Sequence, residues 1–196
     1  MTAKREITRA DIMSMEDFAA VRKQRRAEIS AIKRNRRLAI GPDATIYFEN
    51  YDTMWWQIHE MLHIEKGGEA QISDELAAFN PLIPKGRELV ATLMFEIDDP
   101  ARRNDLLSKL GGIEKCVAIS VGSETIAAVA EDDVERSTDE GRASSVQFLH
   151  FPFTPEQIAE FRDPAKRAVV AIDHPCYGHM AVIAAAVREA LAGDFE

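Results

Sequence analysis

The sequence has few cysteines and no long hydrophobic stretch. Its two cysteines, Cys116 and Cys176, are too few for a disulfide framework and are typical of a reducing compartment. The longest apolar run, residues 180–187, is far too short to cross a bilayer. Residues 1–9 are polar and charged, which is unlike a secretory signal. We therefore expect a cytoplasmic protein without a membrane segment.

Common nucleotide-binding and catalytic motifs are also missing. Neither Gly-x-Gly-x-x-Gly nor the phosphate-loop pattern occurs, so a nucleotide-binding α/β fold has no support. The Gly-x-Ser-x-Gly nucleophile motif is absent. No internal repeat and no low-complexity segment is present, which excludes solenoid architectures.

Length and residue patterns predict one α+β domain over residues 1–196. The chain has 196 residues, of which 46% are hydrophobic and 29% charged, and it can bury a core. Helices are expected at about residues 15–36, 52–66, 73–80, 101–110, 154–162 and 178–191, and strands at about 38–40, 45–49, 87–97, 115–121, 125–130, 146–151 and 168–172. Residues 132–142 are polar and expected to form a loop. The strands arrive as hairpins, which predicts a largely antiparallel sheet with long N-terminal, central and C-terminal helices.

The first predicted helix, at about residues 15–36, is strongly basic. Residues 22–37 carry eight basic side chains and one acid, a local charge of +7 in a chain of −9, so all other residues sum to −16. The basic residues are Arg22, Lys23, Arg25, Arg26, Lys33, Arg34, Arg36 and Arg37. They predict a solvated face, an anion site, or a contact with an acidic protein partner or a second subunit. Nucleic acid is a poor fit, because the remaining chain is acidic and no aromatic residues alternate with these charges.

Residues 59–63 read His-Glu-Met-Leu-His, which is the strongest chemical signal in the chain. Helical side chains four positions apart share one face, so His59 and His63 could bind one metal ion. Glu60 would then be the catalytic base that takes a proton from metal-bound water. This motif predicts a metal-dependent hydrolase as one alternative.

The motif has an ordinary structural explanation as well. A His-Glu-x-x-His motif arises by chance in about one of every hundred chains of this length and composition. Lys66 and Glu69 stand where the longer metzincin motif has glycine and a third histidine. Glu75 is the nearest acidic candidate for a ligand from a following helix. The apolar residues of the same segment already predict a packed amphipathic helix: Met54, Trp55, Ile58, Met61 and Leu62.

A second histidine cluster, His174 and His179, lies in the segment His-Pro-Cys-Tyr-Gly-His. Were the last strand to pair beside the second helix, these rings would join His59 and His63 in one site. Such a site suits zinc, or iron if Glu60 takes part. Each histidine also has a plain reading, either bonded to a backbone carbonyl or exposed in the first turn of a helix.

The order of several segments resembles an uncharacterised bacterial family that carries a domain-of-unknown-function label. The segments are Ile-Thr-Arg-Ala-Asp-Ile-Met, Lys-Arg-Asn-Arg-Arg, Phe-Glu-Asn-Tyr-Asp-Thr-Met-Trp-Trp-Gln-Ile-His-Glu-Met-Leu and Asp-His-Pro-Cys-Tyr. The resemblance spans about residues 7–191 and is most specific around residues 48–65. Genes of that family often lie beside genes for rubrerythrin-like and iron–sulfur oxidoreductase proteins, which implies an accessory part in redox or peroxide handling. The resemblance transfers no catalytic residue, and it favours a structural role for His59 and His63.

Three functions therefore stay open at the level of the sequence. The first is an accessory to a redox system, and it rests on the resemblance. The second is a zinc or iron hydrolase with Glu60 as catalytic base and metal ligands from His59, His63, His174 and His179. The third is an interaction module that uses the basic helix. Whether the protein is an enzyme at all is undecided by these patterns.

Overall fold

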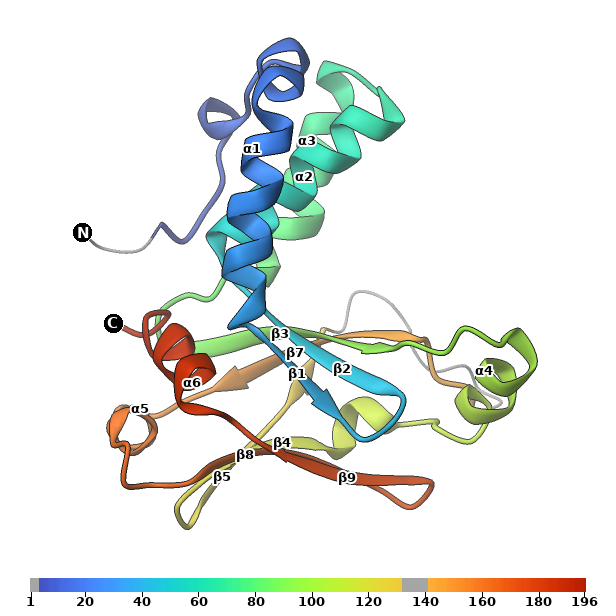
Figure 1. Ribbon diagram of the computed structural model, residues 1–196, viewed down its shortest axis with the longest axis vertical. Helices are drawn as coiled ribbons and strands as arrows, with labels where there is room; N and C mark the ends of the chain where they lie inside the picture. The colour runs from blue at the N-terminus through green and yellow to red at the C-terminus, as the bar shows by residue number, and fades with distance from the viewer. Residues whose placement is uncertain (1–3, 132–140) are drawn as a thin grey trace.

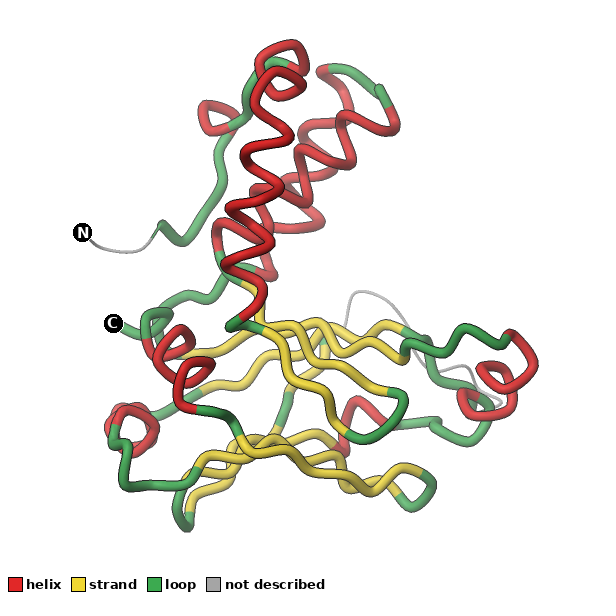
Figure 2. Tube along the Cα trace, viewed as in Figure 1, coloured by secondary structure: helices red, strands yellow, loops and turns green. Residues whose placement is uncertain are grey.

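The computed structural model describes residues 4–131 and 141–196. It is an α+β structure with two antiparallel sheets, as the sequence predicts. Three helices near the N-terminus form a projecting arm, and the strands form a body from which the arm rises (Figures 1 and 2). No helix among the described residues is long and apolar enough to span a membrane.

Local capping explains where the arm helices begin and end. In α1 (Met15–Arg34), the Ser14 side chain accepts a hydrogen bond from the Asp17 amide at the helix N-terminus. In α2 (Tyr51–Glu65), Asn50 and Thr53 bond to each other's backbone as a capping box. That helix ends at Lys66, whose positive φ of 56° turns the chain toward α3 (Glu69–Phe79).

The upper sheet in Figure 1 supports the arm. Its strand order is β1-β2-β3-β7-β6, and every neighbouring pair is antiparallel. The strands are β1 (Arg37–Ile40), β2 (Ala44–Glu49), β3 (Glu88–Phe95), β7 (Val146–Pro152) and β6 (Val129–Ala130). Strands β1 and β2 form the first predicted hairpin.

The lower sheet has the order β5-β4-β8-β9 and is also antiparallel throughout. Its strands are β5 (Glu124–Ala127), β4 (Val117–Val121), β8 (Ala168–His174) and β9 (Tyr177–Val182). Only Ala128 separates β5 from β6, so one segment passes from the lower sheet to the upper. At the opposite edge, the Tyr177 hydroxyl donates to the Ile40 carbonyl at 2.8 Å and accepts from the Asp43 amide at 3.0 Å. The two sheets thus face each other like a flattened barrel.

The main core fills the space between the sheets. Alternation places one face of each strand inward, including Ile46, Leu93, Ile119 and Val170, all fully buried. A second cluster joins the arm to the upper sheet through Ile58 of α2 and Val90 of β3. Helices α4 (Pro100–Leu107), α5 (Pro155–Arg162) and α6 (Ala185–Ala192) lie at the ends of the body (Figure 1). The short 3-10 helices are η1 (Arg9–Asp11), which precedes α1 and contacts α3, η2 (Asn80–Leu82), which follows α3, and η3 (Ile113–Cys116), which precedes β4.

The C-terminal region differs from the expected long helix over residues 178–191. Residues up to Val182 form β9, and α6 spans only Ala185–Ala192. The run 180–187 is apolar without a clear period, and cross-strand pairing with β8 decides its conformation. The predicted loop at 132–142 lies mostly outside the described residues.

Candidate functional site

His59 lies on α2 and is completely buried, at 0% exposure. Its Nε2 accepts a hydrogen bond from the Met13 amide at 3.1 Å, which requires the proton on Nδ1. Nδ1 then donates to the Trp55 carbonyl at 2.7 Å. Burial lowers the pKa of His59, so the ring stays neutral. In this arrangement neither ring nitrogen offers a lone pair to a metal ion.

Two aromatic neighbours, Trp55 and Phe18, pack against the His59 ring and against each other. The ring centroid lies 3.9 Å from Trp55 and 5.0 Å from Phe18 of α1. The Trp55 indole N–H donates to the Asp11 carbonyl at 2.8 Å, and so ties the segment before α1 to α2. His59 therefore joins three segments of the arm, and this is a packing role.

Glu60 faces α1 and is held there by Arg22. The guanidinium donates two hydrogen bonds to the carboxylate, Nε to Oε1 at 2.7 Å and Nη2 to Oε2 at 2.8 Å. Arg22 lowers the pKa of Glu60. A carboxylate that is both paired and less basic is poorly suited to removing a proton from water.

His63 is half-buried and lies at an open surface. It lines a groove of about 620 Å³ at the tip of the arm, whose floor is mainly Met13, Met15, Leu62 and Ile72. Its ring also meets Phe18 edge-on, at 5.8 Å between centroids. The other polar groups at the rim are Arg9, Ser14, Glu16, Lys66 and Glu69, and Arg9 bonds Glu69 at 2.8 Å.

The second histidine cluster lies in the lower sheet, away from α2 (Figure 1). His174 closes β8, and its Nδ1 accepts from the Cys176 amide at 3.2 Å, a local turn contact. His179 is in β9, not in a helical turn, and its ring packs edge-on against Tyr177 at 4.5 Å. The structure does not bring these rings to His59 and His63. Within residues 4–131 and 141–196, no group of three or more His, Cys, Asp or Glu side chains could hold a metal ion.

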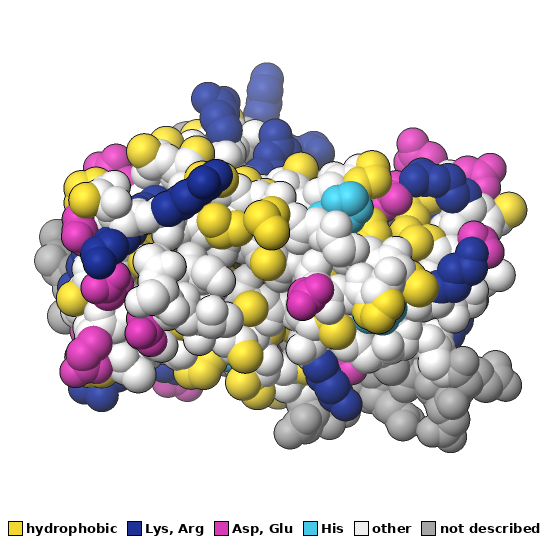
Figure 3. All heavy atoms as spheres, turned by 90° about the horizontal axis from the view of Figure 1, so that it is seen from below, with side chains coloured by type: hydrophobic (Ala, Val, Ile, Leu, Met, Phe, Trp, Pro, Cys, Tyr) yellow, Lys and Arg dark blue, Asp and Glu magenta, His cyan; other side chains and the backbone are white. Residues whose placement is uncertain are grey.

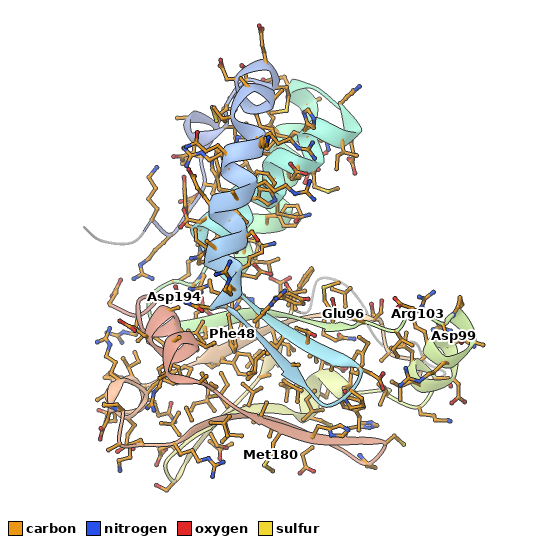
Figure 4. The ribbon with its side chains drawn as sticks, in the orientation of Figure 1. Phe48, Glu96, Asp99, Arg103, Met180 and Asp194 are labelled. Carbon is orange, nitrogen blue, oxygen red and sulfur yellow. The ribbon has the colours of Figure 1, made fainter. Side chains whose placement is uncertain are left out.

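The basic segment divides into paired and unpaired residues. Arg25 bonds Glu28 at 3.0 Å, and Arg36 is only 4% exposed. Arg36 donates to the Phe48 and Glu49 carbonyls, both at 3.0 Å, and forms an ion pair with Asp194. Figure 4 labels Phe48 and Asp194 at this junction of arm and body. Arg36 is therefore part of the interior and is not available to a partner.

Besides the paired Arg25, the exposed cations of α1 are Lys23, Arg26 and Arg34. We call these three the basic stripe. Helical geometry places them within about 80° of one another around the axis and spreads them over roughly 16 Å along it. None forms an ion pair with any residue that the structure describes. Arg37, at the start of β1, is also exposed and continues the positive charge toward the body.

Exposed apolar residues of β9 lie at the end of the molecule away from the arm (Figure 4). Figure 3 shows the molecule from below the lower sheet, where yellow hydrophobic side chains are spread over the face among white atoms, with separate charged side chains between them. Met180 on β9 is 75% exposed and Val182 is 46% exposed. Figure 4 labels Met180 on this side, far from the arm.

Sequence reasoning missed two polar arrangements because their members are far apart in the chain. His150, on β7, lies between Glu88 at 3.0 Å and Glu131 at 3.4 Å. Glu49, on β2, is buried between the hydroxyls of Thr53 and Thr92. Alternation along β2 indicates which face Glu49 occupies, but no local pattern predicts the helix that covers it.

The fold thus defines an α+β protein with a flattened antiparallel body and a projecting arm of three helices. A family model described as "Protein of unknown function (DUF3501)" matches residues 6–195, and the chain belongs to this family. A similar solved structure is a crystal structure of a "novel protein of unknown function" from Burkholderia pseudomallei K96243. It is 37% identical, has a TM-score of 0.89, and the match covers 100% of both chains. The comparison with curated proteins found no match.

Proposed function

We propose that this protein is a binding module whose arm engages an acidic protein partner. The observation that carries the proposal is the exposure of α1. Only Phe18 and Ile29 of its 20 residues are buried, and the basic stripe has no ion-pair partner among the described residues. A long helix that projects from a body and presents uncompensated positive charge is suited to electrostatic recognition.

The charge distribution also indicates the chemistry of the partner. Residues 22–37 carry +7 while the remaining chain carries −16. A polynucleotide that extends beyond the arm would be repelled by the acidic body. A compact acidic protein surface can contact the arm without approaching the body. The tryptophans of α2 do not offer stacking platforms, because Trp55 bonds Asp11 and Trp56 is buried. The acidic body of a second copy fits the same description and would give a homo-oligomer.

The other two functions have less support. The hydrolase would need His59 to give up the Met13 amide and Glu60 to leave Arg22. The accessory role in redox or peroxide handling stays a prediction from family resemblance, as does the cytoplasmic location. An acidic redox protein would be one partner compatible with both the first proposal and that resemblance.

The test uses the full chain and poly-L-glutamate as a defined acidic probe. Fluorescence anisotropy would measure its binding at low and at near-physiological salt. We expect the triple variant Lys23→Ser/Arg26→Ser/Arg34→Ser to bind at least about tenfold more weakly and with a smaller salt dependence. Arg36 is left unchanged, because its removal would disturb the interior.

A matched control removes three exposed cations of the body, in Lys109→Ser/Lys115→Ser/Arg167→Ser. It changes the net charge by the same amount and should retain binding. Equal loss in both variants would mean that only total charge matters, and the proposal would be wrong. Sedimentation of the protein alone at low and high salt then distinguishes a second copy of this chain from a different acidic partner. Only the second copy would give self-association that weakens with salt.

A further inference from the structure

A second cavity lies where the arm meets the upper sheet. It has a volume of about 290 Å³. Its walls come from β2, β3, β7, the three arm helices and the turn after α3. The lining residues are Lys33, Tyr47, Glu49, Met54, Gln57, Phe79, Leu82, Thr92, Met94, Val146 and Phe148. Most of this lining is apolar, so its few polar groups determine what it could hold.

The Glu49 carboxylate is the main polar group of the cavity. The residue is 7% exposed. Oε2 accepts from the Thr53 hydroxyl at 2.6 Å and Oε1 accepts from the Thr92 hydroxyl at 2.9 Å. A carboxylate has about four acceptor positions, so two hydroxyl donors leave acceptor capacity toward the cavity.

Glu49 has no ion-pair partner within the described part of the chain. Its position before α2 places it near the positive end of that helix, which offsets part of the cost of burial. Neutral hydroxyls and a helix terminus supply less than a full positive charge would. A buried carboxylate with spare acceptors therefore favours an added cation.

Lys33 supplies the opposite charge on the wall contributed by α1. It is half-buried and makes no ion pair with the residues that the structure describes. The cavity is therefore lined by one negative side chain, Glu49, and one positive side chain, Lys33. A ligand that carries both a positive and a negative group would complement them. Met54, Met94 and Phe148 line the same cavity and supply thioether and aromatic surface for an apolar group.

We infer that this cavity binds a small zwitterion of the amino-acid type with an aliphatic or thioether side chain. Its ammonium group bonds Glu49, its carboxylate bonds Lys33, and its side chain packs against the methionines and Phe148. The volume of about 290 Å³ is enough for a small ligand such as leucine or methionine, each of which has about nine non-hydrogen atoms. Binding here is separate from the basic stripe, and either proposal can fail alone.

The experiment is isothermal titration of the full chain with four probes. L-Leucine and L-methionine carry both charges, isopentylamine carries only the ammonium, and 4-methylpentanoate carries only the carboxylate. We expect the two amino acids to bind at least about tenfold more tightly than either single-charge probe. Equal binding of isopentylamine and L-leucine, or no binding of any probe, would overturn the inference.

Variants locate the binding. Glu49→Gln keeps the size of the side chain and should weaken L-leucine binding at least about tenfold, whereas Glu189→Gln on exposed α6 should leave it unchanged. Because Glu49→Gln also touches the N-terminus of α2, Lys33→Met provides an independent variant on the opposite wall and should weaken L-leucine but not isopentylamine. Circular dichroism confirms that each variant is folded. Full L-leucine affinity in folded Lys33→Met or Glu49→Gln would contradict the assignment.

Discussion

Arg22 holds Glu60 by two parallel hydrogen bonds of 2.7 and 2.8 Å across the contact between α1 and α2. Glu60 would be the catalytic base of a hydrolase, and the structure shows it in an ion pair between two helices. The pair orients the basic helix α1 against α2 within the arm, so the same arginine that adds to the positive charge of the segment also stabilises the arm.

Replacement of Glu60 by Gln should lower the melting temperature by about 2–4 °C at neutral pH. Arg22 lowers the pKa of Glu60, so the pair stabilises the protein above the ordinary carboxyl pKa of 4.5 and loses this effect as pH falls through the folded-state value. The wild type should therefore lose more stability between about pH 5 and pH 3 than Glu60→Gln does. Thermal unfolding followed by circular dichroism checks both points, with Glu189→Gln as a control.

Removal of the His59 ring should reduce the free energy of unfolding by about 2–4 kcal/mol in His59→Ala. The variant leaves a cavity between Trp55 and Phe18 and leaves the Met13 amide without its acceptor. His63→Ala, at the edge of the groove, should cost less than about 1 kcal/mol. Urea unfolding of both variants makes the comparison, and equal costs would contradict the packing role.

Metal analysis separates this structural role from the metal-binding alternative. Protein purified without added metal or a polyhistidine tag should contain far less than one zinc or iron per chain, because the His59 nitrogens are both bonded. Near-stoichiometric metal that disappears in His59→Ala/His63→Ala would revive the hydrolase.

His150 should make stability depend on pH. The hydrogen bond to Glu88 raises the pKa of His150 above its ordinary 6.5, with a further contribution from Glu131 and an opposing effect of burial. Its stabilising effect is therefore fully present below pH 6.5 and disappears as pH rises through the folded-state pKa. The stability profiles of the wild type and His150→Gln should differ at low pH and converge at high pH. Chemical unfolding between about pH 5.5 and 8.5 measures this, and parallel profiles would refute it.

Arg36→Met should destabilise the protein by about 3–5 kcal/mol, because it leaves Asp194 buried without its cation. Burial already raises the pKa of Asp194. The double variant Arg36→Met/Asp194→Leu should recover most of the loss, since it removes both charges together. Urea unfolding of the two variants tests this account. If the double variant is no more stable than Arg36→Met, the loss does not come from the unpaired charge of Asp194.

Sequence patterns located the first two arm helices and the first hairpin well, whereas α3 begins at Glu69 and not at residue 73. Ser14 is a local signal that acts through its hydrogen bond to the Asp17 amide. The second helix was expected to be capped by Asp52 or Thr53, whereas Asn50 is its N-cap and pairs with Thr53. The patterns were weaker at residues 178–182, where pairing with β8 rather than local preference selects a strand. They also could not show that Arg36 is buried, because its partner Asp194 is 158 positions away.

The sequence by itself was enough to predict the α+β class, the basic character of α1 and the helical spacing of His59 and His63. Each of these features depends on residues that are close together in the chain. Only the packed structure decided what those side chains do. It bonded both nitrogens of His59, paired Glu60 with Arg22, placed His174 and His179 on the lower sheet, and brought Glu49 and Lys33 to the lining of one cavity. Such contacts join segments that the chain brings together only when its apolar faces are buried, so no short motif can specify them.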